Sequence, residues 1–124
     1  MVPDTATTLL TLDLDLECSM GLGSLVAALE PEMCALHLYH DRATLELSIQ
    51  PASVAEAIDG VVSAVERLAA SDRAAWQACE TRSCNIGIQA GIEPYAATFV
   101  VPPSCIAGLG RIGADLVFTV YCPR

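Results

Sequence analysis

The sequence predicts an α+β fold, a two-layer sandwich in which helices cover one face of an antiparallel-rich sheet in a ferredoxin-like or related arrangement. Several short segments alternate apolar and polar residues, the period expected of a strand that is covered on one face only. Two longer segments carry apolar residues at the spacing of an amphipathic helix. The chain has 124 residues, enough for a single domain over residues 1–124 with its own hydrophobic core.

The first half of the chain predicts a strand, a short helix and a hairpin. Residues 8–18 form the clearest strand. One face carries Leu10, Leu12, Leu14, Leu16 and Cys18, and the other carries Thr11, Asp13, Asp15 and Glu17. Ser19 is a suitable N-cap for a helix that ends near Pro31. Residues 33–40 and 43–50 predict a hairpin that turns at Asp41-Arg42. The inward residues of its second strand are Leu45, Leu47 and Ile49.

The second half predicts two helices, a strand and a closing unit. Pro51 opens the main helix, which ends near a break at Ser71-Asp72. Its buried stripe comprises Val54, Ile58, Val61 or Val62, Val65 and Leu68. A short helix at 75–80 packs Trp76 against the sheet edge, and residues 83–92 form a strand. The closing stretch then predicts a short strand at 99–101, a helix, a turn at Gly113 and a last strand whose covered face comprises Leu116, Phe118, Val120 and Cys122.

The charge balance limits the kind of partner. The formal net charge is −9, and the basic residues are all arginines. A chain without lysine can provide neither a phosphate-loop lysine nor a Schiff base, and its negative charge disfavours nucleic acid. A basic protein surface is the partner that this charge favours, because complementary fields accelerate association.

The sequence also predicts a cytoplasmic protein with no membrane association. Its first residues do not read as a secretory signal, and no apolar run reaches the ~20 residues of a membrane-spanning helix. We therefore expect the cysteines to be reduced and mostly buried, four of them as small hydrophobes in predicted strands or helices. The six are Cys18, Cys34, Cys79, Cys84, Cys105 and Cys122.

No metal or cofactor site is predicted. His37 and His40 are three positions apart on a strand, so they point to opposite faces and cannot share a metal. Cys79 and Cys84 have no second pair of ligands at zinc-site spacing. The glycines of GLGRIG, residues 108–113, match a dinucleotide fingerprint only as a string, because they do not lie between a strand and a helix. They are interpreted as a close-packing stretch and a turn.

No catalytic residue is predicted either. Ser48, His37 and Asp13 could be combined on paper into a triad, but no GxSxG motif supports one. The alternating carboxylates of the first strand have a spacing that an acid/base pair could use, without any sign of a substrate pocket. The sequence therefore favours a protein that is not an enzyme.

The C-terminal two-thirds of the chain follow a distinctive order of motifs. A strand LELSI, a long helix and a strand NIGIQ precede a hydrophobic-proline lead and the stretch IAGLGRIGADLVFTVY, so the pattern extends from Ala43 to Tyr121. This order resembles the second half of a widespread bacterial family of small α+β domains of unknown function. Members of that family are associated with immunity or defence and have no accepted catalytic residues, so the resemblance implies a non-catalytic role and assigns no site.

The candidate binding residues lie on the polar face of the predicted sheet. Asp13, Asp15 and Glu17 on the first strand and Glu46 on the third all point away from the apolar layer. We expect a non-catalytic protein-binding domain, an immunity-like or inhibitor protein that neutralises a basic toxin or effector through this acidic surface. Three alternatives stay open: a small-molecule-binding or enzymatic domain with a cleft between sheet and helices, a homodimerising structural subunit, and an acidic face that is simply solvated.

Overall fold

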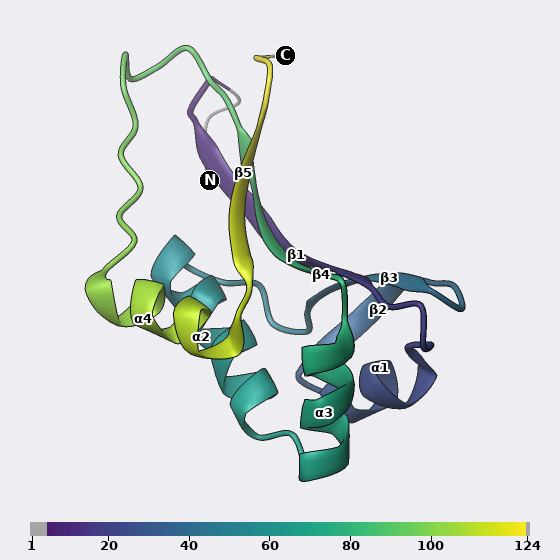
Figure 1. The fold of residues 1–124 in the computed structure, drawn as a ribbon. Helices are drawn as coiled ribbons and strands as arrows, with labels where there is room; N and C mark the ends of the chain where they lie inside the picture. The colour runs from purple at the N-terminus through teal and green to yellow at the C-terminus, as the bar shows by residue number, and fades with distance from the viewer. Residues whose placement is uncertain (1–4, 124) are drawn as a thin grey trace.

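The computed structural model describes residues 5–123, and over this range it shows an open five-stranded sheet and four helices (Figure 1). The strands are β1 (Thr8–Glu17), β2 (Met33–Leu38), β3 (Arg42–Leu47), β4 (Thr81–Gln89) and β5 (Asp115–Tyr121). The helices are α1 (Gly23–Leu29), α2 (Val54–Glu66), α3 (Ala70–Ala78) and α4 (Pro103–Ile112). The predicted α+β class is confirmed.

The first strand of the chain, β1, lies at the centre of the sheet. The strand order is β2-β3-β1-β4-β5, and β1 is antiparallel to both of its neighbours. The first four strands and their helices therefore follow the βαββαβ order of a ferredoxin-like unit. β5 adds to this unit parallel to β4. Because parallel strands need a crossover connection, residues 90–102 and α4 carry the chain back to the start of β5.

The core lies between the sheet and the helical layer. Along β1 the residues alternate between buried and half-exposed, as expected of a strand covered on one face. α2 begins after Ser53, whose side chain accepts a hydrogen bond from the Glu56 amide at 3.1 Å, and it buries the predicted valine and isoleucine stripe. Trp76 on α3 is fully buried, and its Nε1 donates to the Ile112 carbonyl at 2.7 Å. This bond ties α3 to the end of α4.

Several predicted helix boundaries are wrong. The predicted N-cap Ser19 does not cap α1, because its hydroxyl donates to Glu80 at 2.7 Å and the helix begins only at Gly23. The short helix predicted at 75–80 is α3, Ala70–Ala78.

α2 begins at Val54 rather than at Pro51, because Ser53 supplies the N-cap hydrogen bond. The chain breaks between α2 and α3 at residues 67–69, so Ser71 and Asp72 lie in the first turn of α3 and do not interrupt a helix. An acidic residue in a first turn is favourable because it opposes the positive end of the helix dipole.

The strand predicted at 99–101 does not form. These residues belong to the irregular connection between β4 and α4, where Phe99 and Val101 still pack against the core. β4 already pairs with β1 on one side and with β5 on the other, so this segment cannot pair with β4. The following Pro102-Pro103 pair also lacks amide hydrogens for a ladder.

Several apolar residues predicted to face the core are exposed. Ile49 is 81% exposed because β3 ends at Leu47. A register shift between Leu9 and Thr11 leaves the intervening Leu10 37% exposed. On the edge strand β5, whose pairing covers one side only, the residues predicted as covered but found exposed are Phe118, Val120 and Cys122.

One arginine of the sheet holds helix ends in place. Arg82 on β4 lies beside the buried Leu16 of β1, on the helical side of the sheet. Its guanidinium donates hydrogen bonds of 2.8 to 3.2 Å to the carbonyls of Trp76, Gln77, Cys79 and Gly113. Gly113 ends α4 with a φ of 68°, a left-handed conformation that favours glycine. Arg82 thereby satisfies carbonyls at the C-terminal ends of both α3 and α4.

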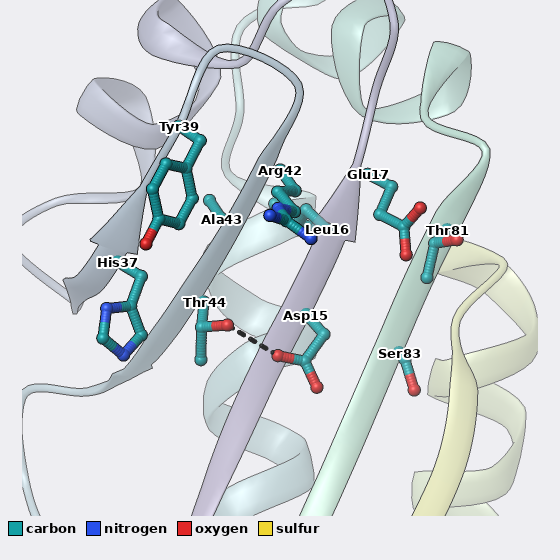
Figure 2. Close-up of a pocket in the computed structure, with 10 residues that line it drawn as sticks. All are labelled: Asp15, Leu16, Glu17, His37, Tyr39, Arg42, Ala43, Thr44, Thr81 and Ser83. Carbon is teal, nitrogen blue, oxygen red and sulfur yellow. Dashed lines mark hydrogen bonds between the residues drawn. The ribbon is translucent and has the colours of Figure 1, made fainter.

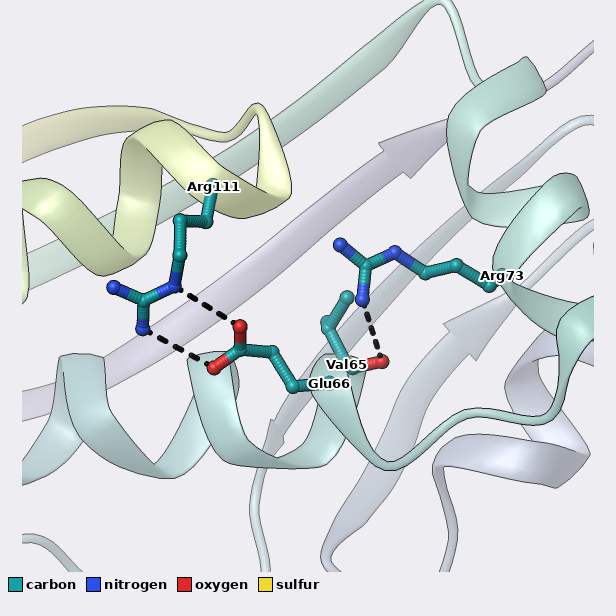
Figure 3. A network of polar contacts seen from close by, with 4 residues as sticks. All are labelled: Val65, Glu66, Arg73 and Arg111. Atoms are coloured by element: carbon teal, nitrogen blue, oxygen red, sulfur yellow. Dashed lines mark hydrogen bonds and ion pairs between the residues drawn. The ribbon is translucent and has the colours of Figure 1, made fainter.

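Other arginines act in the same layer (Figure 3). Arg111 on α4 makes two hydrogen bonds to Glu66 on α2, at 3.0 and 3.2 Å, and this pair lowers the pKa of the Glu66 carboxyl. Arg73 on α3 donates to the carbonyl of Val65 at 3.4 Å. Arg73 and Arg111 therefore join helices on one side of the sheet and do not lie on its far side.

The cysteine prediction is confirmed where burial is concerned. All six cysteines are free thiols; the buried ones are Cys18, Cys79, Cys84 and Cys105, and the exposed ones are Cys34 and Cys122. Within residues 5–123 no helix is long and apolar enough to cross a bilayer.

Leu45→Ala and Ile49→Ala should differ sharply in stability, although both residues occupy inward positions in the sequence pattern. Leu45 is 0% exposed, so its truncation should cost about 2–5 kcal/mol of unfolding free energy. Ile49 is 81% exposed, so its truncation should change stability by less than about 0.5 kcal/mol. Urea unfolding of the two variants measures both values; equal losses would place Ile49 in the core after all.

Candidate functional site

The candidate site is the face of the sheet that points away from the helices, hereafter the outer sheet face. The pairing of the strands arranges its side chains in three rows. From β3 to β5, the first row is Glu46, Asp13, Asn85 and Val117; the second is Thr44, Asp15, Ser83 and Asp115; the third is Arg42, Glu17 and Thr81. The structure therefore brings the four predicted carboxylates together on β1 and β3, and β5 adds Asp115 as a fifth.

A shallow groove of about 540 Å³ crosses this face from β2 to β4 (Figure 2). On its floor Thr44 donates a 2.9 Å hydrogen bond to Asp15, which fixes that carboxylate. At its β2 side the guanidinium of Arg42 lies 5.2 Å from the centre of the Tyr39 ring, an attractive cation–π distance. Asp15 and Glu17 thus remain available to bind donors, while the nearest cation is held by an aromatic ring.

Asp13 lies at a position of this face where the ionised form of a carboxyl is disfavoured. Partial burial, followed by the charges of Asp15 and Glu46, raises the pKa of the Asp13 carboxyl above its usual value of 3.8. Its Oδ1 atom is buried and has no hydrogen-bond partner among the described residues. A buried carboxylate oxygen without a donor is unfavourable, which adds to the cost of ionising Asp13.

The two histidines lie in different places, as the sequence predicts, although the reason is partly different. A register shift between Ala35 and His37 places His37 opposite Thr44, on the outer sheet face. His40 instead lines a hollow with Gly21 and Leu22 near α1. Among residues 5–123 no three His, Cys, Asp or Glu side chains converge to hold a metal.

The residues of the hypothetical triad are not assembled. Ser48 donates its hydroxyl hydrogen to the Pro31 carbonyl, on the helical side of β3. In the described part of the chain no hydrogen bond joins His37 to Asp13 or to Ser83.

The buried cysteines are suited to packing and not to chemistry. Burial is the main cause that raises the pKa of Cys79 to about 12, with a further contribution from the neighbouring Cys18. Burial also raises the pKa of Cys84 to about 12. Since the thiolate is the reactive form, both thiols are inert at neutral pH.

The glycine-rich stretch is a packing element, as predicted. It lies within and at the end of α4, where a Cβ on Gly108 would come within 3.1 Å of the Val62 side chain. Gly113 forms the left-handed C-cap. The stretch does not open a helix after a strand, which a phosphate-binding loop requires.

Sequence reasoning missed part of the groove. Arg42, Tyr39 and Ser83 were not predicted as site residues, because the register that brings β2, β3 and β4 together is not readable from any one segment. Asp115 could have been found, since it begins an alternating strand on the polar side with Thr119.

The alternative of a cleft between sheet and helices has several candidates among residues 5–123. A hollow of about 630 Å³ lies between α1, α3 and the end of β2, and one of about 390 Å³ lies between Leu9, the start of α2 and residues 98–102. A pocket of about 280 Å³ lies between β3 and α2 above Leu47 and Gly60, with the Arg67–Glu32 ion pair of 3.0 Å at its rim. This volume is just below the roughly 300–1,000 Å³ typical of small-molecule sites. It is a weaker candidate than the outer sheet face.

No protein-family model matches this chain, and neither the curated proteins nor the solved structures include one that is significantly similar to it. The resemblance to a bacterial immunity-associated family stays a prediction.

Asp13→Asn should stabilise the protein at neutral pH. The pKa of Asp13 is raised in the native state, so the native state holds the proton more tightly than the unfolded chain does. Stability contributed by this group is therefore present at low pH and is lost as the pH rises through the native pKa. The neutral amide avoids that loss, so its advantage should shrink as the pH is lowered through this window.

Urea unfolding at neutral and acidic pH measures this effect. The matched control is Asp115→Asn, which removes an exposed carboxylate from the same face and should change stability less. An Asp13→Asn variant that is less stable than the parent at neutral pH would contradict the electrostatic strain assigned to Asp13.

Proposed function

We propose that this chain is a non-catalytic protein-binding domain, an immunity-like or inhibitor protein that neutralises a basic protein partner through its outer sheet face. One observation carries the proposal: five carboxylates share a face that the helices leave open. They are Asp13, Asp15, Glu17, Glu46 and Asp115.

The distribution of arginines supports this assignment. Arg42 is the arginine of the outer sheet face. The other described arginines lie on or against the helical layer and are bonded there: Arg67, Arg73, Arg82 and Arg111. The acidic face is therefore poorly neutralised by the protein itself. Such a predominantly negative surface attracts a basic partner over several ångströms and accelerates its association.

Local geometry favours basic side chains as the contacting groups. Asp15 and Glu17 line the groove, where their carboxylates can accept charge-assisted hydrogen bonds from guanidinium or ammonium groups of a partner. Thr44 holds Asp15 in place beforehand, which reduces the entropy lost on binding. An inhibitor needs only to cover its partner, so this proposal requires no catalytic group on the outer sheet face. We expect the partner to be a toxin or effector of the same cytoplasm.

The test removes charge from two places and compares them. One variant combines Asp15→Asn, Glu17→Gln and Glu46→Gln on the outer sheet face. The control combines Glu30→Gln, Glu56→Gln and Glu93→Gln, three exposed carboxylates elsewhere, so both variants lose the same net charge. Asp13 is left unchanged in both because its replacement alters stability.

The partner is captured from the source cell or co-expressed from the adjacent gene. Surface plasmon resonance should show an association rate about tenfold or more lower for the outer-face variant, with a weaker dependence on salt. The control should keep the parent rate and most of the salt dependence. If both variants slow association equally, only net charge matters and the outer sheet face is not the binding site.

A further inference from the structure

The edge strand β5 is unusually open to pairing. It is the last strand of the sheet, and its side chains on both faces are apolar and 38% to 60% exposed at Val117, Phe118, Val120 and Tyr121. Edge strands are normally protected by lysine, proline or a bulge. The opposite edge, β2, has a register shift, but β5 pairs with β4 without one and contains neither lysine nor proline.

One hydrogen bond shows which backbone groups of β5 point toward β4 and which point to the unpaired edge. The Ala90 amide donates to the Tyr121 carbonyl at 2.9 Å, so the polar backbone groups of Tyr121 point toward β4. Backbone groups of successive strand residues point to opposite sides. The amides and carbonyls of Leu116, Phe118 and Val120 therefore point to the unpaired edge, where they can bond another strand.

We propose that two copies of this chain pair through antiparallel β5 strands about a two-fold axis at Phe118, which joins the two sheets into one continuous sheet. In this register Phe118 bonds its counterpart in the second copy, and Leu116 bonds the second copy's residue 120. The residues whose backbone groups point to the unpaired edge are thus opposite each other in the two copies. The two β5 strands overlap over their whole length, Asp115–Tyr121.

A second copy suits this edge because the register is self-complementary. On the helical side, Phe118 meets Phe118 and Leu116 meets Val120, so the exposed apolar strip of each copy is covered by that of the other. On the outer side, Val117 meets Thr119 and Asp115 meets Tyr121, so no carboxylate faces another. For a chain of net charge −9, β5 offers a contact with a single acidic residue at its end.

This pairing does not require the proposed binding function, although Asp115 belongs to both surfaces, and the two respond oppositely to salt. Two copies of the same acidic chain repel each other, so added salt should strengthen the dimer by screening that repulsion. Binding of a basic partner to the outer sheet face should instead weaken with salt. Dimerisation can therefore fail without affecting the proposed function, and the reverse is equally possible.

Analytical ultracentrifugation of the full chain over a range of concentrations tests the proposal. The parent should sediment as a dimer, twice the 13.0 kDa chain, with a dissociation constant that falls as salt is added. Val120→Arg should raise that constant about tenfold or more, because the dimer contains the change twice. The control Ile49→Arg adds the same charge at an 81% exposed position beyond β3 and should leave the dimer intact.

Cross-linking tests the register. In a background with the exposed Cys34 and Cys122 changed to serine, Val117→Cys protein and Thr119→Cys protein are mixed and oxidised with a copper complex. The mixture should form a disulfide-linked dimer, because these positions face each other across the axis. Either protein alone should not, because a residue and its own counterpart lie roughly 7–8 Å apart on the diagonal.

Three results overturn the proposal. A chain that stays monomeric at all concentrations contradicts the proposed dimer. The proposal is also wrong if β5 pairs only with a strand of another protein, and that case gives the same result. A dimer unaffected by Val120→Arg places the interface elsewhere. Circular dichroism spectra and melting curves that match the parent confirm that each variant is folded before its mass is interpreted. Equal cross-linking of the mixture and of the single proteins excludes the two-fold register at Phe118.

Discussion

The structure depends on the strict alternation of β1. From Leu12 to Leu16 every second residue of this central strand is a leucine that packs into the core, and Asp13, Asp15 and Glu17 alternate with these leucines. A slip of one residue would bury three carboxylates and expose the leucines, at a large cost in desolvation. The alternation therefore fixes the register of β3 and β4, the side of the sheet on which the helices pack, and the position of the acidic surface.

The parts of the fold that local patterns determine could be predicted from the sequence. The faces of β1 and the buried stripe of α2 follow from periodicity alone. Phe118 and Ile49 could not be placed correctly, because their exposure depends on which strand lies at an edge and where β3 ends. An alternating pattern indicates that the two faces of a strand differ in polarity. Whether a helix covers the apolar face depends on how the strands and helices pack together.

For the candidate site, too, only the parts that local patterns determine could be predicted from the sequence. Its carboxylates on β1 and β3 are visible in the sequence because they alternate with leucines. Its groove is not, because His37 reaches it through a register shift and Ser83 comes from a strand far along the chain. The unpaired oxygen of Asp13 is likewise a property of the assembled face, since only strand pairing places Glu46 and Asn85 beside it.

The central place of β1 has a consequence for the order in which the chain can fold. β1 is made first, yet one of its two partners, β4, begins at Thr81 and follows most of the chain. Contacts between such distant segments form slowly because a long loop must close first. During synthesis the leucines of β1 lack some of their final neighbours. The three-row acidic surface is incomplete until β4 and β5 have been synthesised. The apolar face of β1 therefore stays without part of its final core until Thr81 and the residues after it have been synthesised.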